Sequence, residues 1–274
     1  MNTIEVQRGD VTLSCLVGGT GPDVVVLLHG LAGSAREMLP TAAALVDEHL
    51  VIVPDLRGHG RSTRRPADLS RRAYADDVAA VIGQLSGGQA VTLAGQSMGG
   101  HTALLTAAWH PDLVRRLVLL EAGVGGPPGA DYPARLGDWF ASWPVPFPDA
   151  AAAADFLGGT PIAAAWISDL EQRADGLWPR FDADIMRAAI TEVAATARWA
   201  EWESLTAPVL LVTGERGLID EPEVQRMLAS GPEVTHTIVA DAGHDVHLDQ
   251  PHAWVRLLKD FIRDVGWSAW RALD

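Results

Sequence analysis

Lysine and cysteine are scarce in this sequence, and long hydrophobic runs are missing. Lys259 is the only lysine, which beside the many alanines indicates a coding bias rather than a function. The single cysteine, Cys15, cannot form an internal disulfide or a cysteine cluster, and we expect it in the core. No apolar run reaches the roughly 18 residues of a membrane span, and the amino terminus does not read as a secretion signal. We therefore expect a cytoplasmic protein.

Positive charge is also in short supply. The chain has 21 Lys and Arg against 35 Asp and Glu, which gives a formal net charge of -14 at pH 7. Such a charge repels phosphate backbones and anionic lipid surfaces, so we expect neither a nucleic-acid partner nor a membrane partner. The length of 274 residues suits one large domain, or a domain with an insertion. The oligomeric state cannot be read from the sequence.

Short apolar runs alternate with segments of helical periodicity through most of the chain. The first two runs predict a hairpin, and the later runs are continuous rather than alternating. Continuous apolar strands separated by helices are typical of a parallel sheet that is covered on both faces. The expected strands are residues 4–7, 11–17, 24–28, 50–53, 90–94, 117–120, 209–213 and 234–240. The expected helices are residues 35–47, 72–85, 98–109, 221–229 and 252–265.

The pattern changes between about residues 124 and 204. Strand-like runs disappear, Pro and Gly cluster, and helices are expected after Asp149, after Thr160 and near Asp182 or Asp184. We interpret this segment, residues 124–204, as a helical cap inserted between two strands of a core domain that comprises residues 1–123 and 205–274.

Six of the ten tryptophans lie in the cap segment: Trp139, Trp143, Trp166, Trp178, Trp199 and Trp202. Most of them should pack the cap against the core, and we expect one or two to line a substrate cavity.

Residues 95–99 fit the pattern Gly-x-Ser-x-Gly. The expected strand before them and the expected helix behind them put Ser97 on a tight strand-to-helix turn. Such a turn strains the serine backbone and leaves no room for side chains at Gly95 and Gly99. A glycine-rich turn that only packs a helix on a strand is the simpler alternative, but the context favours an exposed nucleophile.

A serine hydroxyl needs a base, usually a histidine, from another loop at the same edge of the sheet. His244 follows the last expected strand in residues 241–245, where small residues allow a close turn. The sequence contains nine histidines, so position decides between them. His247 could reach the rim of the same pocket. Other histidines are interpreted as structural: His59 in a loop, His110 at a helix end and His236 on a strand.

The base must in turn be oriented by a carboxylate, for which the sequence offers two candidates. Glu121 follows the strand next after the nucleophile, and Asp220 follows the expected strand 209–213. Both positions lie at the sheet edge where Ser97 emerges. Glu121 could instead be an ion-paired strand end, and Asp220 could cap the helix that follows it.

Two backbone N–H groups should stabilise the developing oxyanion. Met98 would supply one at the start of the helix, and Leu31 would supply the other because Gly30 lets the backbone approach the site. His29 is expected to brace this loop.

These segments make the chain resemble the α/β-hydrolases. The matching stretches are His29-Gly30, residues 54–62 (Pro-Asp-Leu-Arg-Gly-His-Gly-Arg-Ser), residues 95–100 and Ala242-Gly243-His244, in the family's order. The resemblance covers about residues 20 to 123 and 205 to 265. It implies a mostly parallel, eight-stranded α/β-hydrolase sheet with helices on both faces and an inserted helical cap. It also implies that Ser97 is the nucleophile, that His244 is the base, that Leu31 and Met98 are the oxyanion donors, and that residues 55–62 form a structural loop beside the pocket.

The chain departs from the family at the acid. Many relatives carry an aspartate three residues after the glycine that ends the strand matching residues 209–213, and here that position is Gly217. Some lactonases and dehalogenases of the family instead place the acid where Glu121 stands. The resemblance therefore favours Glu121 over Asp220.

Serine at the elbow argues against the related epoxide hydrolases and haloalkane dehalogenases, which use aspartate there. We expect a serine hydrolase that cleaves a carboxylic ester or a lactone of a small, uncharged, hydrophobic substrate through an acyl-enzyme. Carbon-carbon bond hydrolysis or perhydrolysis with the same triad, and a non-enzymatic small-ligand receptor, are the alternatives. We expect no cofactor and no metal.

Overall fold

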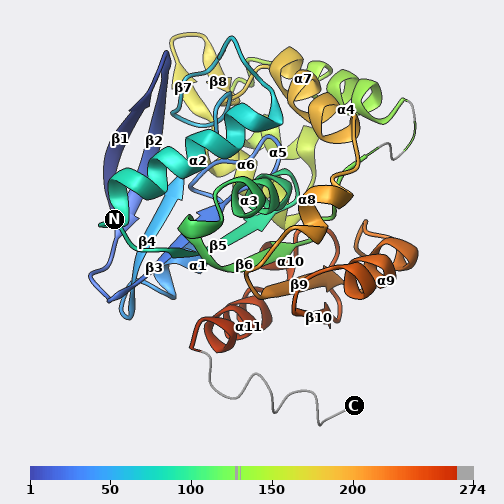
Figure 1. Cartoon of the computed structure of the whole chain (residues 1–274). Coiled ribbons are helices and arrows are strands. Elements are labelled where there is room, and N and C mark those ends of the chain that lie inside the picture. The colour runs from blue at the N-terminus through green and yellow to red at the C-terminus, as the bar shows by residue number, and fades with distance from the viewer. Residues whose placement is uncertain (127–128, 130, 264–274) are drawn as a thin grey trace.

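A sheet of eight strands forms the centre of the molecule (Figure 1). The computed structural model describes residues 1–126, 129 and 131–263. The sheet contains β1 (Asn2–Arg8), β2 (Val11–Gly18), β4 (His49–Pro54), β3 (Asp23–Leu28), β5 (Val91–Gln96), β6 (Val114–Leu120), β9 (Val209–Gly214) and β10 (Val234–Val239), in this spatial order. β2 runs antiparallel to β1 and β4, and the other neighbouring pairs are parallel. This order confirms the predicted fold class.

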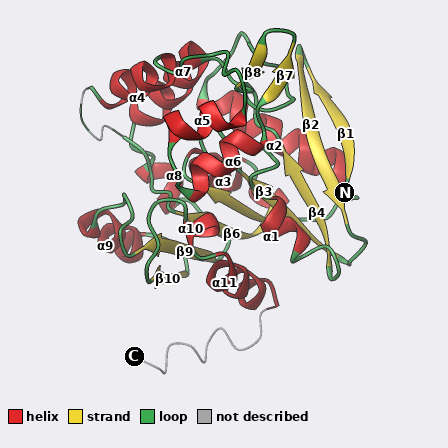
Figure 2. Cartoon of the chain, turned by 180° about the vertical axis from the view of Figure 1, so that it is seen from behind, coloured by secondary structure: helices red, strands yellow, loops and turns green. Residues whose placement is uncertain are grey.

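Helices cover both faces of the sheet (Figure 2). In the core they are α1 (Leu39–Ala43), α2 (Arg71–Leu85), α3 (Met98–Trp109), η1 (Pro111–Leu113), α9 (Glu221–Ser230), α10 (Val246–Asp249) and α11 (Pro251–Arg263). Alternate residues of β3 bury on opposite faces: Val24 and Val26 belong to the apolar cluster that includes residues of α2, α3 and α9, whereas Val25 and Leu27 belong to the one that includes residues of α1 and α11. None of the described helices combines the length and the apolarity needed to cross a lipid bilayer.

Helix α1 is much shorter than the predicted helix over residues 35–47. It spans Leu39–Ala43, with Pro40 in its first turn. Proline fits the first turn of a helix but has no N–H to continue one that arrives from the amino side. The N–H of Ala35 instead donates to Asp55 Oδ1 at 2.6 Å. The segment before Pro40 is therefore a loop tied to the end of β4.

The cap segment, residues 124–204, contains helices α4 (Tyr132–Ala141), α5 (Ala150–Leu157), α6 (Pro161–Ser168), α7 (Ala183–Ala194) and α8 (Trp199–Glu203). As expected, Asp149 and Thr160 cap α5 and α6 by accepting hydrogen bonds from first-turn N–H groups. The expectation that strands vanish here is wrong, because β7 (Glu171–Arg173) pairs with β8 (Gly176–Trp178). Strands of three residues are too short to show an apolar alternation, which is why the sequence pattern did not reveal them.

Aromatic side chains form the core of the cap segment. Phe140, Trp143 and Phe181 lie in mutual contact, with ring centroids between 5.1 and 6.0 Å apart. Trp202 instead packs into the large core under the sheet, where its Nε1 donates to the carbonyl of Met227 at 3.2 Å. Trp143 and Trp202 thus serve packing, the role that was expected for most of the cap tryptophans.

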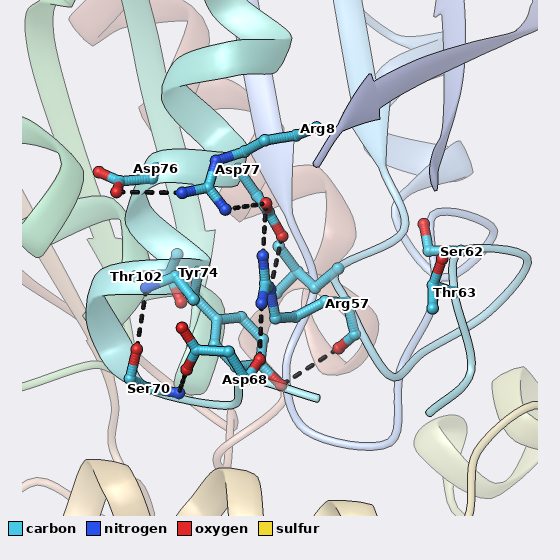
Figure 3. Close-up of polar contacts among 12 residues, drawn as sticks. Arg8, Arg57, Ser62, Thr63, Asp68, Ser70, Tyr74, Asp76, Asp77 and Thr102 are labelled. Carbon is cyan, nitrogen blue, oxygen red and sulfur yellow. Dashed lines mark hydrogen bonds and ion pairs between the residues drawn. The ribbon is translucent and has the colours of Figure 1, made fainter. Parts of the chain in front are cut away.

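The loop after β4 is fixed to α2 by a buried ion pair (Figure 3). Arg57 donates through Nε and Nη2 to the two carboxylate oxygens of Asp77, each at 2.7 Å, and both side chains are buried. Nη1 of Arg57 donates to the carbonyl of Asp68 at 2.6 Å. The two-point geometry and the burial hold this loop in one position beside the site described below.

Asp77→Ala should therefore lower the free energy of unfolding by about 3–5 kcal/mol, because it leaves the Arg57 guanidinium buried without its partner. Urea unfolding followed by circular dichroism measures this loss. The control is Asp131→Ala, which removes one partner of the exposed Arg135–Asp131 pair and should change stability little. Equal losses in the two variants would contradict the structural role assigned to the buried pair.

Candidate active site

Ser97 lies on a strained turn between β5 and α3. Its φ of 51° and ψ of -119° place it in a region that non-glycine residues rarely adopt. A Cβ atom at Gly95 would lie 2.3 Å from the carbonyl oxygen of Gly99, and one at Gly99 would lie 2.3 Å from that of His29. Both glycines are therefore required by close backbone contacts, as the sequence pattern indicates.

His244 comes from the loop between β10 and α10 and lies beside Glu121, at the end of β6. Its Nδ1 is 3.2 Å from Glu121 Oε2, and the Glu121 side chain is fully buried. Ser97 and His244 line the same cavities. The structure thus brings three of the predicted site residues, which follow β5, β6 and β10, to one cavity.

Glu121 is held by backbone donors as well as by the imidazole. Its Oε1 accepts from the N–H of Gly214 at 2.7 Å, and its Oε2 accepts from the N–H of Leu218 at 2.8 Å. A Cβ atom at Gly217 would lie 2.0 Å from Glu121 Oε1. The missing side chain at residue 217 therefore makes the space that the Glu121 carboxylate occupies.

Asp220, the alternative acid, has a different task. It is the N-cap residue of α9, and its Oδ1 accepts from the N–H of Glu223 at 2.8 Å. Within the described part of the chain no hydrogen bond joins Asp220 to His244. The geometry therefore favours Glu121 as the orienting acid.

The two expected oxyanion donors flank Ser97. Met98 is the first residue of α3, so its N–H has no acceptor within the helix. Leu31 lines a cavity together with Ser97. A Cβ atom at Gly30 would lie 3.5 Å from the Cβ of Ser97, so the loop before Leu31 runs close to the hydroxyl.

Gln96 was not anticipated from the sequence. It is buried, and its Nε2 donates to the carbonyl of His244 at 3.1 Å and to Asp245 Oδ1 at 3.4 Å. Its Oε1 packs against Gly30 so closely that a Cβ atom there would lie 2.2 Å away. Gln96 therefore connects the histidine loop to the loop of Leu31. The pattern Gly-x-Ser-x-Gly leaves this position open, so no local signal could have found it.

The other histidines have structural contacts. His29 Nε2 accepts from the N–H of Leu56 at 3.0 Å, which leaves Nδ1 to donate to the carbonyl of Gly30 at 2.7 Å. His29 thus braces its loop, as expected. Burial lowers the pKa of His59 to about 3, with smaller contributions from His29 and Arg71. His247 is buried and lies 3.0 Å from Glu37 Oε1, away from the cavity linings.

Two cavities reach Ser97 and His244. The larger, of about 640 Å³, extends between the loop after β6, α7 and the start of α9, and its wall includes Trp199. The second, of about 220 Å³, is called the aromatic cavity here, because Trp139, Phe140 and Trp166 of the cap segment line it. Trp139, Trp166 and Trp199 thus line the cavities that reach Ser97, whereas one or two cap tryptophans were expected to line a substrate cavity. Among the described residues no group of His, Cys, Asp and Glu is arranged to hold a metal ion.

The sheet, the strained serine turn and the imidazole–carboxylate pair at one sheet edge together define a protein of the α/β-hydrolase type. A model of the alpha/beta hydrolase family matches residues 25–257. The chain therefore belongs to the alpha/beta hydrolase family.

Curated relatives and a solved structure agree with this family. The chain is 28% identical to a 2-(acetamidomethylene)succinate hydrolase of Mesorhizobium japonicum, an alignment that covers 94% of each chain. It is 27% identical to the esterase YbfF of Escherichia coli, over 88% of this chain and 93% of that protein. The crystal structure of E-2-(acetamidomethylene)succinate hydrolase superposes with a TM-score of 0.85 at 24% identity, over 96% of this chain and 99% of the other. These relatives support a hydrolase.

The contacts of Glu121 and Asp220 generate a prediction about the acid. Glu121→Gln should lower kcat for an activated ester about a thousandfold, because an amide cannot stabilise the imidazolium that forms on His244. Asp220→Asn should change kcat by only a few-fold, since an asparagine still caps α9. Steady-state kinetics on a p-nitrophenyl ester compares the two variants. The reverse order would make Asp220 the acid.

The space at Gly217 generates a second prediction. Glu121→Gly should be nearly inactive. The double variant that also carries Gly217→Asp should have a kcat at least about tenfold higher than that of Glu121→Gly. The new carboxylate would enter the emptied space and meet the same backbone donors, Gly214 and Leu218. Gly217→Asp in the wild-type chain is the control, and it should destabilise the protein by colliding with Glu121. A double variant no faster than Glu121→Gly would contradict this account.

Proposed function

We propose that the protein is a serine hydrolase that cleaves a carboxylic ester or a lactone of a small hydrophobic substrate through an acyl-enzyme. The contact of His244 with the buried Glu121 carboxylate, in a cavity that also exposes Ser97, carries this proposal. The curated esterase among the relatives supports the ester reading over the other acyl chemistries. The aromatic side chains in the cavity wall support a hydrophobic substrate.

The first half-reaction forms the acyl-enzyme. His244 takes the proton of the Ser97 hydroxyl as the oxygen attacks the ester carbonyl, and Glu121 stabilises the imidazolium. The N–H groups of Leu31 and Met98 stabilise the oxyanion, each by about 3 kcal/mol in comparable enzymes. The tetrahedral intermediate then collapses, the carbon–oxygen bond to the alcohol breaks, and His244 gives its proton to the leaving oxygen.

The second half-reaction releases the acid. A water molecule loses a proton to His244 and attacks the acyl carbonyl through the same oxyanion contacts. Collapse of this intermediate breaks the bond to Ser97, which recovers its proton from His244. The net reaction consumes one water and yields an acid and an alcohol, or a hydroxy acid when the substrate is a lactone.

Replacement of Ser97 by Ala should abolish the turnover of p-nitrophenyl esters and the labelling of the protein by a fluorophosphonate probe, while circular dichroism remains unchanged. The physical reason is that alanine has no hydroxyl oxygen that could attack the ester carbonyl or react with the probe. Ser168→Ala, which changes an exposed serine of the cap segment, is the matched control and should retain both properties. Turnover retained by Ser97→Ala would refute the nucleophile.

The same assay separates the alternatives. A wild-type protein that the fluorophosphonate probe does not label, but that binds small esters, would point to a receptor. A labelled protein that is inactive on esters and active on β-diketones or with peroxide would point to carbon-carbon hydrolysis or perhydrolysis. The cytoplasmic location and the absence of nucleic-acid and membrane partners stay predictions.

A further inference from the structure

Carboxylates line the two cavities that reach Ser97. Glu37 and Asp245 line the aromatic cavity, and Glu121, Asp220 and Glu223 line the larger one. Among the residues that the structure describes, neither lining includes Lys or Arg. A substrate that carries a carboxylate would therefore meet like charge and no cationic partner in either cavity.

Glu37 places a buried carboxylate in the wall of the aromatic cavity. It belongs to the loop between β3 and α1, and its side chain is only 4% exposed. Oε1 lies 3.0 Å from His247 Nε2, and Oε2 packs against Gly33. In the described part of the chain neither Lys nor Arg pairs with Glu37. Its charge therefore has one imidazole as its partner.

Asp245 adds a second, less compensated carboxylate to the same wall. Burial raises the pKa of Asp245, and the nearby Glu37 and Asp249 raise this pKa further, against the opposing effects of His244 and His247. The polar contact of its side chain with Gln96 Nε2 is long, at 3.4 Å. A positive charge in the cavity would stabilise the ionised form of Asp245.

Three arginines, Arg36, Arg61 and Arg180, are bound by another carboxylate. Asp169, which directly follows α6, lies 2.9 Å from Nη2 of Arg61, 3.5 Å from Nε of Arg36 and 3.6 Å from Nε of Arg180. These contacts join the cap segment to the core domain. They also keep three guanidinium groups directed at Asp169 rather than at the cavity of Ser97.

The aromatic side chains of this cavity suit a weakly hydrated cation. The Trp139 and Trp166 rings lie 5.6 Å apart, and Phe140 lies 4.9 Å from Trp139. The faces of such rings attract ammonium groups, and the attraction grows when the group is removed from water. Carboxylates and aromatic side chains thus line one small cavity together with Ser97.

We propose that this site selects substrates by charge: the aromatic cavity takes a substituted ammonium group of a hydrophobic ester, held by Glu37, Asp245 and the faces of Trp139 and Trp166, and carboxylate-bearing esters are rejected. This inference rests on the proposed function and names its substrate class. The tryptophan-rich cap alone favoured an uncharged substrate. Glu37 and Asp245 in the cavity wall change this expectation to a hydrophobic substrate with a positive charge.

Two series of matched esters test the proposal. The first consists of acetate esters of choline, of its neutral carbon isostere and of an alcohol of similar length that ends in a carboxylate. The second consists of p-nitrophenyl esters whose acyl chains end in trimethylammonium, in tert-butyl and in carboxylate. In at least one series kcat/KM should be about tenfold higher for the cation than for the neutral ester. In both series the anion should be slower than the neutral ester. Any other order overturns the proposal.

A binding measurement keeps this test independent of turnover. The same esters are titrated into the Ser97→Ala variant, and their dissociation constants are measured by calorimetry. Tighter binding of the cation supports charge selection, and equal or weaker binding overturns it, whether or not the wild-type protein hydrolyses any ester. If the protein hydrolyses esters but does not prefer the cationic ester, only this inference is overturned. If it neither hydrolyses esters nor is labelled at Ser97, the proposed function is overturned.

Variants locate the selectivity in the wall. Glu37→Gln should reduce the ratio of kcat/KM for the cationic ester to kcat/KM for the neutral ester at least about fivefold, and Asp245→Asn should reduce the same ratio. Glu5→Gln removes the same charge from an exposed position on β1 and should leave the ratio unchanged. If Glu37 had a purely structural role, its substitution would lower kcat/KM for all esters alike and preserve the ratio between the cationic and the neutral ester. That result would overturn its assignment. Asp245→Asn supplies the test if Glu37→Gln fails to fold.

Discussion

The buried carboxylate of Glu121 joins three segments at the carboxyl edge of the sheet. It extends from the end of β6, accepts hydrogen bonds from the N–H groups of Gly214 and Leu218 after β9, and contacts His244 after β10. A buried carboxylate needs hydrogen-bond donors in place of the water that it has lost. The same contacts that supply these donors also fix the position of the histidine relative to the strand of Ser97. A displacement of any of the three segments would therefore move the imidazole of His244 relative to Ser97.

The parallel sheet makes this convergence possible. The carboxyl ends of β3, β5, β6, β9 and β10 open at one edge, so five loops that are distant in sequence share a small volume. Close backbone contacts at Gly95 and Gly99, and the close approach of the Gln96 and Ser97 side chains to Gly30, then bring Ser97 against the neighbouring loop. Gln96 completes the arrangement because its amide reaches both the histidine loop and Gly30. The strained turn at Ser97 is thus held by neighbours on both sides.

Local sequence signals predicted the sheet and the tight turn at Ser97 well, because both depend on short-range patterns. A continuous apolar strand, a glycine-flanked serine and a helix are readable within about fifteen residues. The choice of the acid stayed open in the sequence. It depends on whether the Glu121 carboxylate fills the space beside Gly217, and these two residues are far apart in the sequence. The short helix α1 and the hairpin of β7 and β8 were misjudged for local reasons, a proline and very short strands.

The electrostatic character of the site could not be read from composition. A net charge of -14 says nothing about which carboxylates face the substrate. Glu37 and His247 are separated by 210 residues, yet they form one buried pair that holds Glu37 in the cavity wall. Asp169 gathers Arg36, Arg61 and Arg180 at the junction of cap and core. Because Arg36 lies on the same loop as Leu31, this ion-pair cluster links the placement of the cap to the loop expected to hold the oxyanion. Arg36 and Arg61 thus bind Asp169 of the segment 124–204, and within the described part of the chain neither pairs with Glu37 or Asp245 of the cavity wall.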